Sequence, residues 1–229
     1  MNRTLAAVLI SPLTAAAAFS AALLAFSALS RLNAALPLIA GGILYLPLHF
    51  SAGKGRFFYV LAHELSHALA ALVSGVKVRR IKVRRDGGYV AMDSTNAFIS
   101  LAPYFVPFYA LAAGAAYIVA GYFMDMAPYR RLFIAATGFL LAFHMLNTFE
   151  ILSGPLQSDL KKAGGAVFSF SMVILLNSLC LALALKLIFP DLVSIKAYAW
   201  QVWASAGSIL RWLWAASAWC CAAAKEYLG

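Results

Sequence analysis

Residues 57–74 read FFYVLAHELSHALAALVS, an apolar stretch whose middle is interrupted by His63, Glu64 and His67. In an α-helix, residues four apart return to one face about 6 Å along the axis, so the two imidazoles can bind one metal ion from the same side. Glu64 lies about 100° around the helix from His63 and can reach a water molecule at that metal. The pattern is typical of zinc peptidases, in which two histidines hold the ion and the glutamate is the general base.

Two other interpretations of this motif remain open. The histidines could belong to a hydrogen-bonded packing network between helices, or to a proton relay. Three ionisable groups within five residues of a hydrophobic helix are, however, costly unless they are used. The sequence therefore favours a metal site, and catalysis at it.

The composition predicts an all-α polytopic membrane protein. The 229 residues are 64% hydrophobic and 11% charged, against about 45–50% and about 25% in soluble domains. A soluble enzyme, a disordered tail, a coiled coil and a disulfide scaffold are excluded. The net charge is +10, but the basic residues lie in short gaps between apolar runs. Membrane topology and anionic lipids explain them better than nucleic acid, so the bilayer is the expected partner.

We expect a bundle of about five or six transmembrane helices. The first run could instead be a cleaved signal peptide, but it is long for one. The last segment, 191–229, is rich in tryptophan, and Arg211 near its middle favours an interfacial helix over a span. The domains are predicted as N-terminal membrane segments (1–56), a protease core (57–189) and the C-terminal helix (190–229). The earlier apolar runs are 4–29, 33–50 (kinked), 57–74, 97–123, 131–152 and 166–189.

Residues 76–92 predict a small basic β-hairpin at the membrane surface. Apolar and basic residues alternate with one slip, and Asp86-Gly87-Gly88 is a tight-turn signal. An irregular basic loop is the alternative. If every run through residue 189 crosses the membrane, the positive-inside rule places the 76–96 hairpin in the cytoplasm and the N-terminus outside. We therefore expect a multi-pass protein of a bacterial-type plasma membrane.

A catalytic zinc site usually has a third protein ligand, and few residues can supply it. His49 is expected at the outer interface, and Asp86, Asp93 and Asp125 in surface turns. Three candidates are left in one later stretch: His144, Glu150 and Asp159.

The order of these features resembles the site-2 protease family of intramembrane zinc metalloproteases. The resemblance is carried by His63–His67 in a hydrophobic helix, the basic β-like segment, two spans, and then Asn147 followed by Pro155-Leu-Gln-Ser-Asp159. It implies that His63, His67 and Asp159 hold Zn²⁺ and that Glu64 is the base. It also implies a membrane-protein substrate, cleaved within or near a transmembrane segment.

The chain departs from the commoner family pattern. Ser158 and Leu160 flank Asp159 where Leu-Asp-Gly is usual, which resembles the divergent bacterial and plant branch. No PDZ-like insertion separates the two spans. Asn147 is a candidate for orienting substrate or stabilising an oxyanion, with a helix–helix hydrogen bond as the alternative, and His144 is a candidate neighbour of the ligands.

Asp159 can reach the metal only if the chain bends after the span at 131–152. A straight helix to residue 159 would run about 42 Å, past a hydrocarbon core of about 30 Å. Pro155 favours a break. We therefore expect a helix end near 151–154 and a re-entrant segment at 155–160. By the resemblance, an edge strand of the hairpin is a hypothetical dock for an extended substrate; a lipid-headgroup anchor is the alternative.

Two other functions stay open. A prenyl-protein-processing type of membrane metalloprotease would use Glu150 as the third ligand. A non-proteolytic metal-binding or transport protein would need no general base at Glu64.

Overall fold

The computed structural model describes residues 3–51 and 55–228. The chain is mostly helical, with one short hairpin in the described part, which confirms the predicted all-α polytopic fold. In chain order the elements are α1 (Arg3–Leu29), α2 (Leu32–His49), α3 (Arg56–Val73), β1 (Val78–Arg84), β2 (Gly87–Met92), α4 (Ala97–Phe105), α5 (Phe108–Ala120), the 3-10 turn η1 (Ala127–Tyr129), α6 (Arg130–Ser153), α7 (Ser158–Ala163), α8 (Ala166–Ile188) and α9 (Ile195–Leu228).

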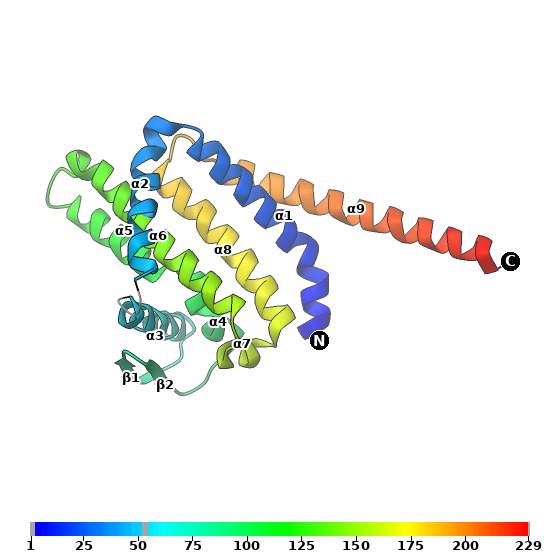
Figure 1. The fold of residues 1–229 in the computed structure, drawn as a ribbon, viewed down its shortest axis with the longest axis horizontal. Helices are drawn as coiled ribbons and strands as arrows, with labels where there is room; N and C mark the ends of the chain where they lie inside the picture. The colour runs from blue at the N-terminus through cyan, green and yellow to red at the C-terminus, as the bar shows by residue number, and fades with distance from the viewer. Residues whose placement is uncertain (1–2, 52–54, 229) are drawn as a thin grey trace.

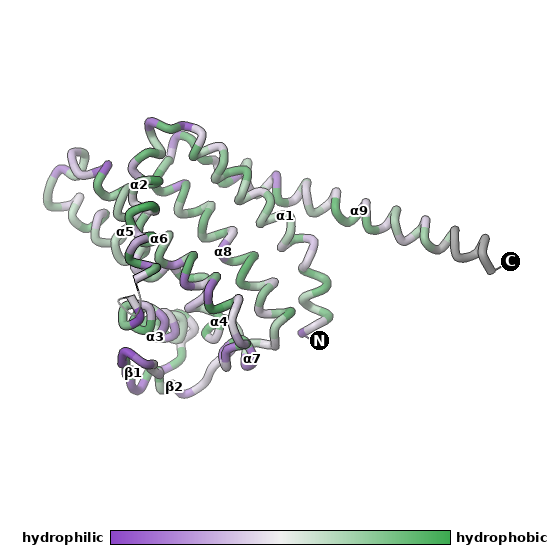
Figure 2. Tube along the Cα trace, viewed as in Figure 1, coloured by the Kyte–Doolittle hydropathy of each residue, from purple (hydrophilic) through white to green (hydrophobic). Residues whose placement is uncertain are grey.

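The long helices α1, α2, α6 and α8 form the body of the molecule (Figure 1). Within the described residues, four helices are long and apolar enough to cross a membrane, or five if the bent pair α4–α5 counts as one span. The expected number was about five or six. Figure 2 shows these helices as mostly hydrophobic, while hydrophilic residues gather on the hairpin and α7. The chain is an integral membrane protein.

Glycines allow α2 and α6 to pack at very close range. A Cβ atom at Gly41 would collide with the carbonyl oxygen of Ala135, and one at Gly138 with that of Leu38. Helices in membranes approach one another through such small residues. This pair of helices therefore forms a rigid wall beside the site described below.

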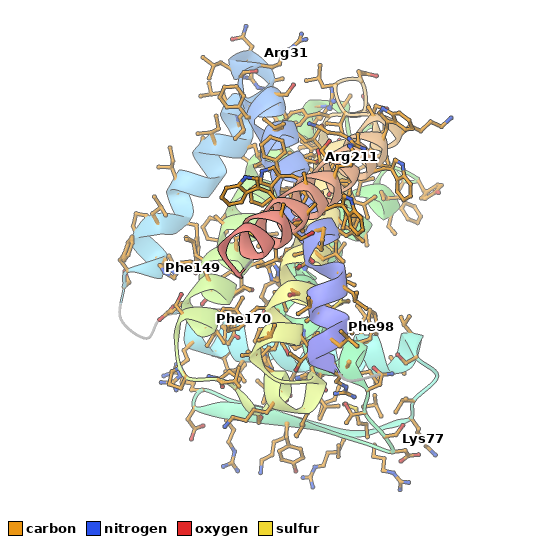
Figure 3. The ribbon with its side chains drawn as sticks, turned by 90° about the vertical axis from the view of Figure 1, so that its right-hand side faces the viewer. Arg31, Lys77, Phe98, Phe149, Phe170 and Arg211 are labelled. Atoms are coloured by element: carbon orange, nitrogen blue, oxygen red, sulfur yellow. The ribbon has the colours of Figure 1, made fainter. Side chains whose placement is uncertain are left out.

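Helix α3 lies across one end of the bundle and does not run along its length. Figure 1 shows it nearly end-on, whereas α2, α6 and α8 run in the plane of the view, and Figure 3 shows it from the side. It is not among the candidate spans of the described residues, because polar side chains interrupt its middle. The prediction that 57–74 passes through the bilayer is therefore not supported by the fold.

The fold does not favour the expected placement of the N-terminus on the membrane side opposite the hairpin, for the same reason. Only α1 and α2 lie between Arg3 and α3, so the chain returns to the end where it began. The Arg3 guanidinium donates hydrogen bonds to the carbonyl oxygens of Lys162 (2.9 Å) and Ala163 (2.6 Å), beside the hairpin end. Arg31, between α1 and α2, lies at the opposite end from Lys77 (Figure 3).

The hairpin is built as the sequence predicts. β1 and β2 pair antiparallel, and Arg84 faces Gly87 across a two-residue turn, Arg85-Asp86. The register shifts between Val78 and Arg80, at the slip in the alternation. The turn begins one residue earlier than Asp86-Gly87-Gly88. Gly87 then has φ +156°, a conformation that side chains disfavour.

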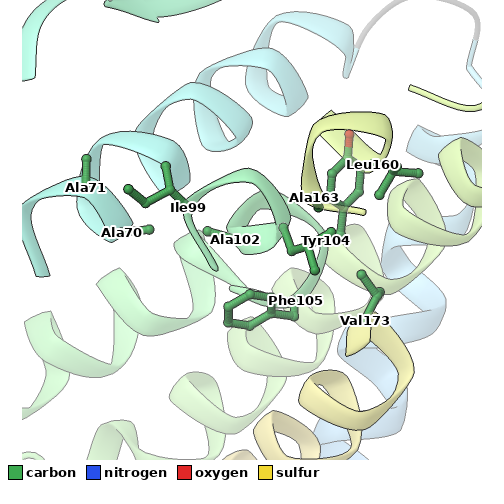
Figure 4. Packing of buried hydrophobic residues seen from close by; sticks show 10 residues of the cluster. Ala70, Ala71, Ile99, Ala102, Tyr104, Phe105, Leu160, Ala163 and Val173 are labelled. Atoms are coloured by element: carbon green, nitrogen blue, oxygen red, sulfur yellow. The ribbon is translucent and has the colours of Figure 1, made fainter. Parts of the chain in front are cut away.

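The chain bends sharply after α6, as expected. The helix ends at Ser153, within the predicted 151–154, and residues 154–157 are not helical. The segment 155–160 differs from the prediction in one respect: it is not irregular throughout, because α7 begins at Ser158. Leu160 and Ala163 of α7 are buried in a core shared with α3, α4 and α8 (Figure 4). This burial fixes the position of Asp159, which lies between the bend and Leu160.

Helix α9 packs on α1 only through its first half. Tyr198, Val202 and Ala206 are buried there against Ala17 and Ala21 of α1. The second half extends away from the bundle (Figure 1), and α9 is not among the candidate spans of the described part. The predicted domain boundary at residue 190 falls in the connection between α8 and α9, and the one at residue 56 falls at the first residue of α3. Both stay predictions.

Candidate metal centre

The two histidines of α3 lie on one face of the helix and meet. Their ring centroids are 4.8 Å apart in an edge-to-face arrangement. Glu64 and His67 are buried, with 6% and 9% of their surface exposed, and His63 is half-buried. The spacing of four residues therefore has the geometric result that the sequence predicts.

Asp159 reaches this face from α7. Its Oδ2 atom lies 3.3 Å from Nε2 of His63 and 3.4 Å from Nε2 of His67. The three side chains each offer a ligand atom within 4.8 Å of the others. Among the described residues, no other group of three or more His, Cys, Asp or Glu side chains meets this criterion. The structure thus brings together all three residues expected to bind zinc.

The Nδ1 atoms of both histidines, which are not the nitrogens nearest Asp159, each have a hydrogen-bonding partner. Nδ1 of His67 lies 2.8 Å from the carbonyl oxygen of Ile99 in α4. A carbonyl only accepts, so Nδ1 donates, and in the neutral ring Nε2 is left as an acceptor. Nδ1 of His63 is 3.4 Å from the Tyr59 hydroxyl, one turn earlier. Such partners orient ligating histidines.

This arrangement fits a cation. The Nε2 lone pair of His67 faces a carboxylate oxygen that is also an acceptor, and two acceptors at this distance repel each other unless a proton or a metal ion lies between them. Burial raises the pKa of Asp159, but the adjoining His63 and His67 side chains outweigh it and keep the pKa well below its usual range. The carboxylate is therefore ionised. Two imidazole nitrogens and one carboxylate oxygen form a donor set that suits Zn²⁺ and leaves a position open.

Two hollows meet at this group. The first, of about 680 Å³, lies among the ends of α2 and α6, the start of α3 and the hairpin turn. The second, of about 580 Å³, lies among β2, α3 and α7. Both are lined by His63, Glu64, Gly88, Gln157 and Asp159. A chain passing from one hollow to the other would cross the candidate metal ligands beneath the hairpin.

Gly88 brings β2 against the candidate base. A Cβ atom at Gly88 would lie 2.7 Å from Cγ and 2.8 Å from Oε1 of Glu64, and 2.7 Å from the carbonyl oxygen of Lys82. No side chain fits there without displacing Glu64 or the neighbouring strand. We interpreted Gly88 only as part of a turn. The second of two adjacent glycines was the available signal for a close contact.

Asn147 and His144 lie near the group but are not part of it. The Asn147 amide donates to the Tyr45 hydroxyl (2.8 Å) and to its own helix at Phe143 (2.7 Å), and the side chain lines the first hollow. Nε2 of His144 lies 3.2 Å from Oδ1 of Asn177 in α8. His144 therefore joins two helices. A role for Asn147 toward substrate stays a prediction.

The other candidate ligands are placed apart from the three. Glu150 is exposed, and although it lines the first hollow with His49 and Asp86, none of these belongs to the close group. Asp93 pairs with Arg79 on the hairpin. Asp125 accepts a hydrogen bond from the backbone N–H of Ala127.

Comparison with known families agrees with this geometry. A family model described as Peptidase M50B-like matches residues 38–149, which include α3 and its two histidines and end before Asp159. The match supports a membrane metallopeptidase by class. The matched part, just under half of the chain, is similar to the M50B-like peptidases, a site-2 protease family. Neither the curated proteins nor the solved structures contain a match to the chain.

Proposed function

We propose that this chain is a zinc-dependent endopeptidase that hydrolyses peptide bonds within or near transmembrane segments of other membrane proteins. The observation that carries the proposal is the convergence of His63, His67 and Asp159 beside Glu64. The match to the M50B-like family model supports a peptidase. The identity of the metal and of the substrates is part of the proposal.

His63, His67 and Asp159 are the proposed zinc ligands. Zinc in a site of this type polarises a carbonyl group and makes water acidic enough to ionise near neutral pH. The protein orients the ligands: the Ile99 carbonyl directs His67 and Tyr59 directs His63.

Glu64 is the proposed general base. It follows His63 directly and lies at the junction of the two hollows. Burial raises the pKa of Glu64. The neighbouring His63 and His67 lower this pKa, whereas the nearby Asp159 raises it further. A carboxylate with a raised pKa accepts a proton from water more readily. The base would then pass that proton to the amine that leaves.

The substrate is expected to enter as an extended segment. A helix hides its peptide bonds within its own hydrogen bonds, so some unwinding must precede cleavage. The two hollows run along β2, whose outer edge is not paired in the described part of the chain. Main-chain pairing with such an edge is a common way of holding an extended peptide.

The hairpin end is proposed to face the cytoplasm. Basic residues concentrate there and are sparser at the other end, where Arg31, Arg130, Arg131 and Lys186 lie. The positive-inside rule then orients the molecule. Because Arg3 lies at the hairpin end, the N-terminal end of α1 is proposed to be cytoplasmic as well. The basic residues of the hairpin end are Arg3, Arg56, Lys77, Arg79, Arg80, Lys82, Arg84, Arg85, Lys161 and Lys162.

Metal content and cleavage, measured on the same preparation, test the proposal. The purified protein should hold about one zinc ion per chain and cleave co-expressed single-span reporter proteins, with fragments identified by mass spectrometry. A chelator should abolish cleavage, and added zinc should restore it. A protein that binds zinc but releases no fragment from any reporter would instead favour the metal-binding or transport alternative.

A further inference from the structure

Helix α4 contributes two contacts to the candidate metal centre. Every residue from Ile99 to Phe105 is buried, and the side chain of Asn96 caps the helix by accepting a hydrogen bond from the Ile99 N–H at 2.8 Å. The chain then bends by 76° between α4 and α5. One contact is the hydrogen bond that the Ile99 carbonyl oxygen accepts from Nδ1 of His67. The other is the side chain of Tyr104, which no motif in the sequence singled out.

Tyr104 touches two of the three proposed ligands. Its ring packs edge-on against His63, with centroids 5.6 Å apart and an interplanar angle of 86°. Its hydroxyl and the Asp159 carboxylate lie next to one another in the lining of the first hollow. Figure 4 shows the side chain directed toward α7, where Leu160 and Ala163 are buried beside it. Only 1% of the Tyr104 surface is exposed, so water competes little for the hydroxyl.

The backbone of Tyr104 is held from the opposite side. Its carbonyl oxygen accepts a 2.7 Å hydrogen bond from the Asn177 amide of α8. Oδ1 of the same amide lies 3.2 Å from His144 of α6. A partly buried polar pair between α6 and α8 thus anchors the end of α4. Because the backbone is held and the ring is packed, the orientation of the Tyr104 hydroxyl is fixed.

We propose that Tyr104 is a positioning residue that holds the Asp159 carboxylate in the orientation needed for metal binding. The hydroxyl donates to one carboxylate oxygen, which leaves the other directed at Nε2 of His63 and His67. The ring edge limits rotation of His63. Ligating carboxylates are commonly hydrogen-bonded in this way, and loss of such a partner typically weakens metal binding 10- to 100-fold. The proposal rests on the proposed zinc site.

The test compares Tyr104→Phe with Tyr117→Phe in the full-length, detergent-purified protein. Phenylalanine keeps the packing of Tyr104 and removes only its hydroxyl. The Tyr117 hydroxyl donates to the Met126 carbonyl oxygen, at the end of the bundle away from the hairpin, so its loss is a matched control. Zinc affinity is measured by competition with a chromophoric chelator, and folding by thermal unfolding of the metal-free protein.

We expect Tyr104→Phe to bind zinc about 10- to 100-fold more weakly, with unfolding unchanged, and Tyr117→Phe to bind it like the unaltered protein. Asp159→Asn separates positioning from a general structural effect. In that background Tyr104→Phe should weaken zinc binding no further, because the carboxylate it positions is gone. Zinc affinity of Tyr104→Phe within twofold of the unaltered protein, or an equal loss in both backgrounds, would overturn the proposal. Failure of the unaltered protein to bind zinc would overturn the proposed function itself.

Discussion

Gly88 of β2 lies directly against Glu64 of α3, so close that a Cβ atom at Gly88 would stand 2.7 Å from Glu64 Cγ. The hairpin thereby forms the wall beside the proposed base. At so short a distance there is room for the main chain of β2 but not for a side chain at residue 88.

Gly88→Ala is therefore expected to lower cleavage by at least tenfold while zinc stays bound. The added methyl group must displace either Glu64 or β2, and a small displacement of a base costs much of its effect. Cleavage of a reporter and zinc content are measured together. Gly114→Ala in α5 is the control, since nothing lies within 4 Å of a Cβ there. Equal activity of Gly88→Ala and the unaltered protein would show that the hairpin does not constrain the base.

Asp159→Asn should lose most of its zinc, whereas Glu150→Gln should keep it. The Asp159 oxygen lies 3.3 Å and 3.4 Å from the two histidine nitrogens, while Glu150 is exposed and outside the close group. Each substitution removes one negative charge at similar size, so the pair is matched. Zinc per chain is measured by elemental analysis after dialysis. The reverse result would favour the prenyl-protein-processing type of site.

A tag on the N-terminus and a reporter in the hairpin turn at 85–86 should report the same side of the membrane, the cytoplasm. A reporter at 122–126 should report the other side. The hydrogen bonds from Arg3 to Lys162 and Ala163 place the first helix at the hairpin end, and the basic residues there orient it. Opposite locations for the N-terminal tag and the hairpin reporter would mean that α3 crosses the membrane after all.

Gly138→Ala should lower the free energy of unfolding by about 1–3 kcal/mol, the usual range for overpacking. A Cβ atom at Gly138 would collide with the main chain of α2, which cannot rotate away as a side chain can. Thermal unfolding in detergent measures the effect. Gly42→Ala is the control, because its nearest neighbours would lie 3.8 Å and 3.9 Å away. An unfolding midpoint shared by both variants would contradict the close packing of α2 and α6.

Local signals in the sequence predicted much of this structure. Helical spacing placed His63 and His67 on one face, the slip in alternation located the register shift in β1, and Pro155 located the end of α6. Each depends on the backbone geometry of a few neighbouring residues. Asp159 could be singled out only by resemblance to a family.

The orientation of α3 could not be read in the same way. Eighteen mostly apolar residues fit a membrane crossing as well as a helix lying across the bundle, and the choice depends on what α4, α7 and the hairpin pack against. The contacts of Gly88 and Tyr104 were missed for the same reason. They join residues far apart in the chain, and no local pattern records them.

Glu64→Gln tests the central claim most directly. The substitution removes the carboxylate that takes a proton and leaves His63, His67 and Asp159 in place. Purified Glu64→Gln protein should hold as much zinc as the unaltered protein and unfold at the same temperature. Its cleavage of a single-span reporter should fall by at least 100-fold, the lower end of the usual contribution of a general base. Cleavage at the unaltered rate by zinc-loaded Glu64→Gln protein would contradict the assignment of this chain as a peptidase of this mechanism.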